Sequence, residues 1–114
     1  MQAIYLVAFF SITYLAAAND RDCRLECHNA AISYRNLKKE GVTGEELERR
    51  VMEECKTFAE KLYYPCEKAV PLILKDEGIK KTIEAWDVDA AYDKETTKKV
   101  NKHCFKACRN HREE

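Results

Sequence analysis

The six cysteines are the residues of this chain whose type and number point most directly to chemistry. A thiol can form a disulfide, bind a metal or act as a nucleophile, and the compartment decides among these uses. An even number of cysteines in a short secreted chain is typical of a disulfide framework, here of three bridges. The six are Cys23, Cys27, Cys55, Cys66, Cys104 and Cys108.

The amino-terminal segment indicates a secreted protein. Residues 4–15 form an apolar-to-neutral run, and the three alanines at 16–18 supply the small side chains that a signal peptidase accepts. A membrane anchor is the alternative, but it needs ~20 apolar residues and this run is shorter. We therefore predict a signal peptide over residues 1–18 and a single extracellular, disulfide-rich helical domain over residues 19–114.

Other chemistry finds little support in the sequence. Cys27-His28 and His103-Cys104 could form a Cys/His metal site, but cysteines joined in disulfides do not coordinate metals. Residues 87–93 begin like a calcium loop, but other residues occupy the positions of its glycine and its chelating glutamate. No serine or cysteine has a suitable catalytic partner. We predict no metal, no cofactor and no enzymatic activity.

Charge and composition limit the fold and the partners. The chain carries 20 Lys+Arg and 20 Asp+Glu, and this neutrality argues against a nucleic-acid partner, which selects for net positive charge. Only three Gly and two Pro occur, while helix-forming Lys, Glu, Ala and Arg are abundant. The predicted fold class is all-α, a small disulfide-stapled bundle of four to five helices.

Apolar periodicity places the first two helices. The first is predicted to run from about Asp20 to Lys39. Its inward face is Cys23, Cys27, Ala30, Ala31, Tyr34 and Leu37. The second begins at Thr43, whose hydroxyl should accept a hydrogen bond from the first turn while Glu46 reaches back, as in a capping box. Its inward stripe is Leu47, Val51, Cys55, Phe58 and Leu62.

Prolines, a glycine and aspartates divide the rest of the chain. Pro65 is expected to be the first residue of a third helix, and Pro71 to cause a kink or a restart within it. Gly78 is a second weak point. Residues 87–89 are predicted to form a loop, and Asp93 to cap the last helix. The inward face of that helix is Thr97, Val100, Cys104, Ala107 and Cys108.

The cysteine spacing restricts how the helices meet. Cys23 and Cys27 are four apart on the first helix, as Cys104 and Cys108 are on the last, so each pair is stacked one turn apart. If these helices run antiparallel, Cys23 meets Cys108 and Cys27 meets Cys104. A parallel arrangement is geometrically open, but it is less natural for termini that return to one end. The two central cysteines are then left for each other.

The order and spacing of the cysteines resemble those of the saposin-like (saposin B-type) family. Here 27 residues separate Cys27 from Cys55 and ten separate Cys55 from Cys66, and residues 43–55 resemble the family's second helix. The chain departs from the family in its first pair, C-x-x-x-C rather than C-x-x-C, and in the closer spacing of its last pair. The resemblance implies a saposin-like fold with the pairs Cys23–Cys108, Cys27–Cys104 and Cys55–Cys66.

The resemblance also implies a secreted, non-enzymatic protein that interacts with lipids or membranes. Its apolar helix faces would open, or dimerise into a homodimer, around acyl chains. The lipid-contacting residues would be Val70, Leu72, Ile73, Leu74, Ile79, Ile83 and Trp86. A basic series on the last helix would lie near anionic headgroups, or else form a solvated face neutralised by neighbouring acidic residues. It consists of Lys94, Lys98, Lys102, Lys106, Arg109 and Arg112.

Two other functions fit the same frame. A secreted helical effector or toxin-like protein would use its charged faces to bind a protein receptor. A carrier would enclose a small hydrophobic ligand. Neither requires a residue beyond those already named.

Overall fold

The computed structural model describes residues 2–86 and 94–112, and the side chains of residues 20–86 and 94–109 within them. These residues form helices and connecting turns, so the predicted all-α, disulfide-stapled bundle is confirmed for the described part of the chain. The elements are α1 (Gln2–Lys39), α2 (Gly44–Phe58), η1 (Ala59–Lys61), α3 (Cys66–Ala69), α4 (Pro71–Leu74), α5 (Glu77–Glu84) and α6 (Lys94–Arg112).

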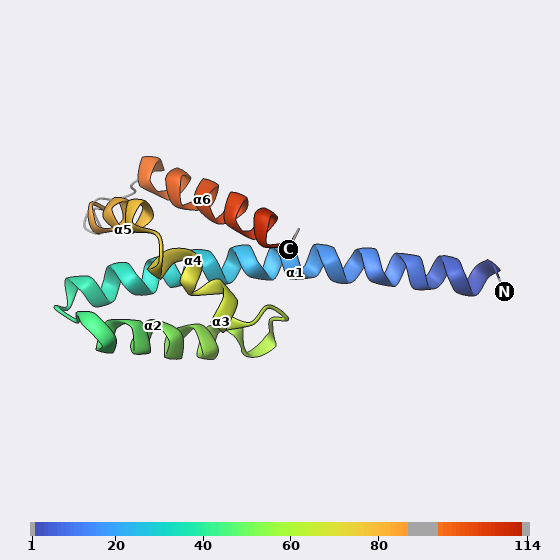
Figure 1. The fold of residues 1–114 in the computed structure, drawn as a ribbon, viewed down its shortest axis with the longest axis horizontal. Coiled ribbons are helices and arrows are strands. Elements are labelled where there is room, and N and C mark those ends of the chain that lie inside the picture. The colour runs from blue at the N-terminus through green and yellow to red at the C-terminus, as the bar shows by residue number, and fades with distance from the viewer. Residues whose placement is uncertain (1, 87–93, 113–114) are drawn as a thin grey trace.

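Helix α1 is the spine of the molecule. It begins at Gln2 and not near Asp20 as predicted, because no proline or glycine interrupts residues 2–20 and the helix continues through them. Its amino-terminal part, which includes the predicted signal peptide, projects beyond the other helices (Figure 1). Over the described residues, no helix is both long enough and apolar enough to cross a membrane.

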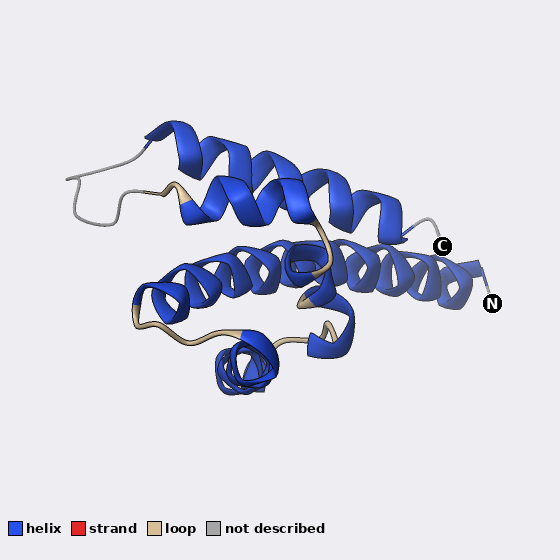
Figure 2. Cartoon of the chain, turned by 60° about the vertical axis from the view of Figure 1, so that its left-hand side comes forward, coloured by secondary structure: helices blue, strands red, loops and turns tan. Residues whose placement is uncertain are grey.

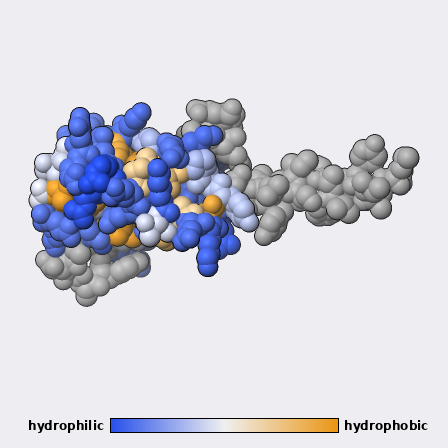
Figure 3. Space-filling view, turned by 90° about the horizontal axis from the view of Figure 1, so that it is seen from below, coloured by the Kyte–Doolittle hydropathy of each residue, from blue (hydrophilic) through white to orange (hydrophobic). Residues whose placement is uncertain are grey.

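The other helices pack on two sides of α1. Helices α2 and α3 lie on one side and α5 and α6 on the other (Figures 1 and 2). The predicted inward face of α1 is buried in full: Cys23, Cys27, Ala30, Ala31, Tyr34 and Leu37. Seen from the α2 side, the surface is mostly hydrophilic, with small apolar areas between charged side chains (Figure 3).

The start of α2 differs from the predicted capping box. Thr43 is the N-cap residue in an extended conformation, but its side chain makes no capping hydrogen bond. Glu46 instead accepts hydrogen bonds from the Arg49 guanidinium, one of them 2.6 Å long, which draws its carboxylate away from the cap. Phe58 was predicted to face inward, but it is 46% exposed. It is the last residue of α2, so the predicted inward stripe ends before it.

The third helical segment is broken into short pieces. Pro65 caps α3 from outside, so it is not the first helical residue as predicted, whereas Pro71 does restart the helix as the first residue of α4. The next break falls at Asp76, whose carboxylate accepts a hydrogen bond from the Ile79 amide at 3.0 Å, and Gly78 lies inside α5. The predicted loop and cap at residues 87–93 lie outside the described residues.

Three disulfides tie these helices together. Cys23–Cys108 and Cys27–Cys104 join α1 to an antiparallel α6, with Cα–Cα distances of 5.9 and 5.7 Å. Cys55–Cys66 joins α2 to α3 across 6.0 Å. The structure thus forms the same three pairs that the resemblance implies. On α6, Val100 is buried along with its two cysteines, while Thr97 and Ala107 are half-buried.

Candidate functional site: a cationic face on the first and last helices

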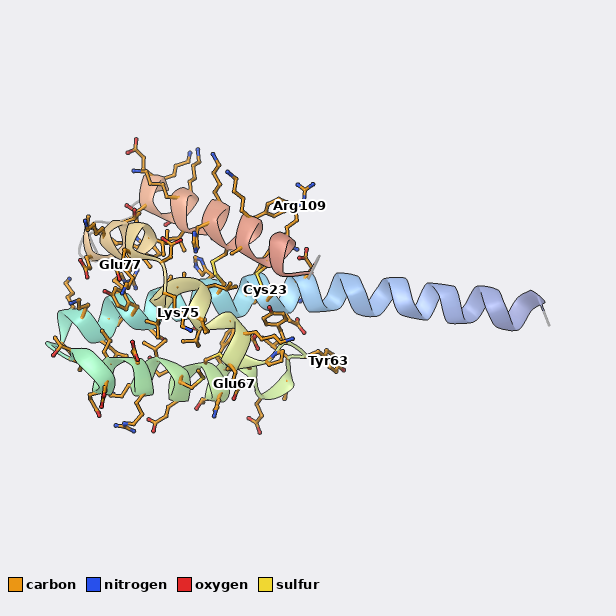
Figure 4. The ribbon with its side chains drawn as sticks, in the orientation of Figure 1. Cys23, Tyr63, Glu67, Lys75, Glu77 and Arg109 are labelled. Carbon is orange, nitrogen blue, oxygen red and sulfur yellow. A yellow bond between two sulfur atoms is a disulfide. The ribbon has the colours of Figure 1, made fainter. Side chains whose placement is uncertain are left out.

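The basic series of α6 is an exposed row. Lys94, Lys98, Lys102 and Lys106 follow at every fourth position, and all four are exposed, as is Arg109 at the end of the row. Figure 4 shows nitrogen-tipped side chains along α6 pointing away from the other helices. The side chain of Arg112 lies outside the described residues.

The lysine row is not neutralised by neighbouring helices. Within the described part of the chain, no carboxylate lies within ion-pair distance of the four lysine ammonium groups. Helix α6 carries seven Lys and Arg against one Glu, although the whole chain is neutral. Positive charge is therefore concentrated on this side of the molecule.

An open groove of about 670 Å³ lies beside this row, between α1 and α6. Its lining residues are Arg21, Arg24, Leu25 and His28 of α1 and Thr97, Asn101, Lys102, Cys104 and Phe105 of α6. Leu25 is 40% exposed and Phe105 is 48% exposed, so the groove holds two large apolar side chains in contact with water. Both lie outside the buried stripes of their helices, which is the sequence signal that could have identified them.

Arginines border the apolar part of the groove. The Arg24 guanidinium lies 5.7 Å from the centre of the Phe105 ring, a cation–π distance, and 3.9 Å from a carboxylate oxygen of Asp20. At the other end, burial lowers the pKa of His28, an effect that the Asn101 side chain partly opposes. The imidazole is therefore neutral at pH 7, and the positive charge of the groove comes from its arginines and Lys102.

The residues predicted to contact lipid mostly form the core. Val70, Ile73, Ile79, Ile83 and Trp86 are buried, and Leu72 and Leu74 are half-buried against the same core. Polar contacts hold this segment to α1, since the Tyr34 hydroxyl donates to Glu84 at 2.7 Å and the Arg35 guanidinium stacks 4.5 Å from the Trp86 ring. In this closed bundle these apolar residues present little surface to lipid, and the buried ones would reach it only after the segment left α1.

Glu26 is an ionisable residue in the interior that sequence patterns did not single out. It is fully buried, and neither carboxylate oxygen has a hydrogen-bond partner among the described residues. Burial, together with the nearby charges of Asp22 and Glu67, raises its pKa to about 7. Its position three residues after Cys23 and four before Ala30 places it on the buried face of α1, so the helical period held the signal.

The described residues offer one cluster of potential metal ligands, and its two cysteines are not available to a metal. The Glu26 carboxylate lies within 4.8 Å of the sulfurs of Cys55 and Cys66, but those sulfurs are bonded to each other. The two histidines beside cysteines do not form a common site. His28 lines the groove, whereas Nε2 of His103 lies 2.8 Å from the carbonyl oxygen of Leu72 in α4.

No protein-family model, no curated protein and no solved structure matches this chain. The saposin-like resemblance therefore stands on cysteine spacing and helical pattern. We define the cationic face of the molecule as the exposed lysine row of α6 together with the α1–α6 groove beside it.

Proposed function

We propose that this chain is a secreted, non-enzymatic protein that binds anionic lipid surfaces through the cationic face. The observation that carries the proposal is the lysine row of α6, exposed and without an ion-pair partner among the described carboxylates. Each such lysine near an anionic membrane contributes about 1 kcal/mol of attraction. Four lysines on one helix face can therefore act together on a flat surface.

The apolar residues of the groove support the same face. Leu25 and Phe105 border the cationic row, and an amphipathic surface that combines Lys or Arg with Phe or Leu is typical of proteins that adsorb at a membrane interface. Binding of this kind leaves the bundle closed. It differs in that respect from lipid uptake by an opened saposin-like fold, which would have to expose the core residues of α3 to α5.

Charge reversal on α6 should abolish binding to anionic vesicles. In the variant Lys94→Glu/Lys98→Glu/Lys106→Glu, three attractive charges become repulsive, so we expect vesicle affinity to fall by more than about 100-fold. Lys102 is left in place because it also lines the groove. The measurement is co-sedimentation with phosphatidylserine-containing vesicles and with neutral phosphatidylcholine vesicles, at low and physiological salt.

A matched control separates local from net charge. The variant Lys61→Glu/Lys68→Glu/Lys75→Glu makes the same change in net charge at exposed positions on the α2–α4 side of the bundle. We expect this variant to lose much less affinity for anionic vesicles than the α6 variant does. Circular dichroism should show that both variants are folded. Failure of the unmodified protein to bind anionic vesicles at low salt would overturn the proposal. It would favour the other class of partner for this row, an acidic protein receptor.

A further inference from the structure

The α1–α6 groove has the dimensions of a small-molecule site. Its volume of about 670 Å³ falls within the ~300–1,000 Å³ typical of such sites. It extends from Arg21 to His28 along α1 and from Thr97 to Phe105 along α6, which at 1.5 Å per residue is roughly 10–12 Å. That length suits one medium-length alkyl chain.

The walls of the groove combine apolar and cationic side chains. Leu25, Phe105 and the disulfide-bonded Cys104 provide apolar contact, and nearly half of each of the first two side chains is exposed to water. A ligand that covered them would remove this apolar area from water, which is favourable in proportion to the area.

The charged residues of the groove select the headgroup. Arg21, Arg24 and Lys102 line it, and none of its nine lining residues is acidic. The nearby carboxylate of Asp20 is 3.9 Å from Arg24, a distance that leaves guanidinium N–H groups free to bind another anion. Arginine binds carboxylates through paired hydrogen bonds, so a carboxylate headgroup matches these side chains in both charge and geometry.

We infer that the groove binds a free single-chain carboxylate amphiphile, a medium-chain fatty acid, with its alkyl chain along Leu25 and Phe105 and its carboxylate at Arg21 and Arg24. This site goes beyond adsorption to a membrane, because it is complete in the closed monomer and needs no bilayer. Both activities use Leu25, Phe105 and Lys102 of the groove. Vesicle binding depends mainly on the lysine row of α6, whereas fatty-acid binding depends on the groove and on Arg21 and Arg24.

Calorimetric titration with sodium decanoate, below the concentration at which it forms micelles, tests the site. We expect saturable binding of one decanoate per chain. The variant Leu25→Ser/Phe105→Ser should bind at least about tenfold more weakly, since both apolar contacts are lost. The control Phe58→Ser, which changes a similarly exposed phenylalanine on α2, should bind as the unmodified protein does.

A second pair of ligands tests the headgroup. The variant Arg21→Gln/Arg24→Gln should weaken decanoate binding and leave binding of decanol, which has the same chain and no charge, unchanged. The lysine-row variant of α6 should keep decanoate binding even where it loses vesicle binding, so the two proposals can fail separately. The inference would be overturned by the absence of saturable decanoate binding, or by equal binding to the Leu25→Ser/Phe105→Ser variant.

Discussion

Replacing Glu26 by glutamine should make the protein about 3 kcal/mol more stable to unfolding at pH 8 and leave its stability near pH 4.5 almost unchanged. In the folded protein the pKa of Glu26 is raised from 4.5 to about 7, chiefly because burial disfavours the carboxylate. The glutamine variant cannot ionise, so it avoids the cost of a buried, unpartnered charge at high pH.

The direction of this pH dependence follows from proton binding. Between pH 4.5 and pH 7 the unfolded chain has released the Glu26 proton while the folded protein still holds it, so rising pH favours unfolding. Stability contributed by the protonated carboxyl is therefore present below pH 4.5 and fully lost above pH 7. In the unmodified protein this residue alone lowers the free energy of unfolding by about 1.4 kcal/mol per pH unit across that window.

Urea denaturation at several pH values measures the effect. The difference between the free energies of unfolding of Glu26→Gln and the unmodified protein should grow from near zero at pH 4.5 to its full value above pH 7. Glu48→Gln, at an exposed position of α2, is the control and should follow the unmodified protein throughout. Parallel curves for Glu26→Gln and the unmodified protein would contradict the burial of this carboxyl.

Removal of both α1–α6 disulfides should destabilise the protein by more than the sum of the two single removals. Either bridge closes a long loop, since their sequence separations are 85 and 77 residues. While one bridge remains, the second bridge closes only a small loop of roughly eight residues, because the two cysteines on each helix are four positions apart. In the chain-entropy account, closing such a loop adds about 2–3 kcal/mol to the free energy of unfolding. The last bridge to be removed then costs about 4–5 kcal/mol.

The variants that test this are Cys23→Ser/Cys108→Ser, Cys27→Ser/Cys104→Ser and the combination of the two pairs. We expect each pair alone to lower the free energy of unfolding by about 2–3 kcal/mol and the combination by about 7 kcal/mol, enough to unfold many domains of this size. The Cys55–Cys66 disulfide spans a sequence separation of only 11 residues, so its removal in Cys55→Ser/Cys66→Ser serves as the short-loop comparison. Strict additivity would show that the two bridges do not constrain the same loop.

Sequence patterns predicted the features of this fold that are set within a single helix. The inward face of α1 follows from a period of three to four residues, and the restart at Pro71 follows from its missing N–H. The predicted capping box at Thr43 is wrong, and the sequence pattern could not show why. Arg49 competes for the Glu46 carboxylate, and that competition depends on which rotamers the two side chains adopt.

The features that matter for function depend on how two helices lie side by side. Leu25 and Phe105 form a groove only because the disulfides fix α1 against α6, and no period within either helix specifies that crossing. Glu26 was not predicted to face inward, because carboxylates are rarely buried, although its position places it on the buried face of α1. The lysine row was visible in sequence, whereas the absence of a carboxylate partner among the described residues depends on where those residues lie in three dimensions.

Lysine footprinting on anionic vesicles is the most direct test of the central claim, that the cationic face binds lipid. The unmodified protein would be acetylated with and without phosphatidylserine-containing vesicles, and the rate at each lysine read by mass spectrometry. We predict that vesicles slow modification of Lys98, Lys102 and Lys106 and leave Lys61 and Lys75 unaffected. Equal protection on both sides of the bundle, or protection confined to the α2–α4 side, would contradict the proposed binding face.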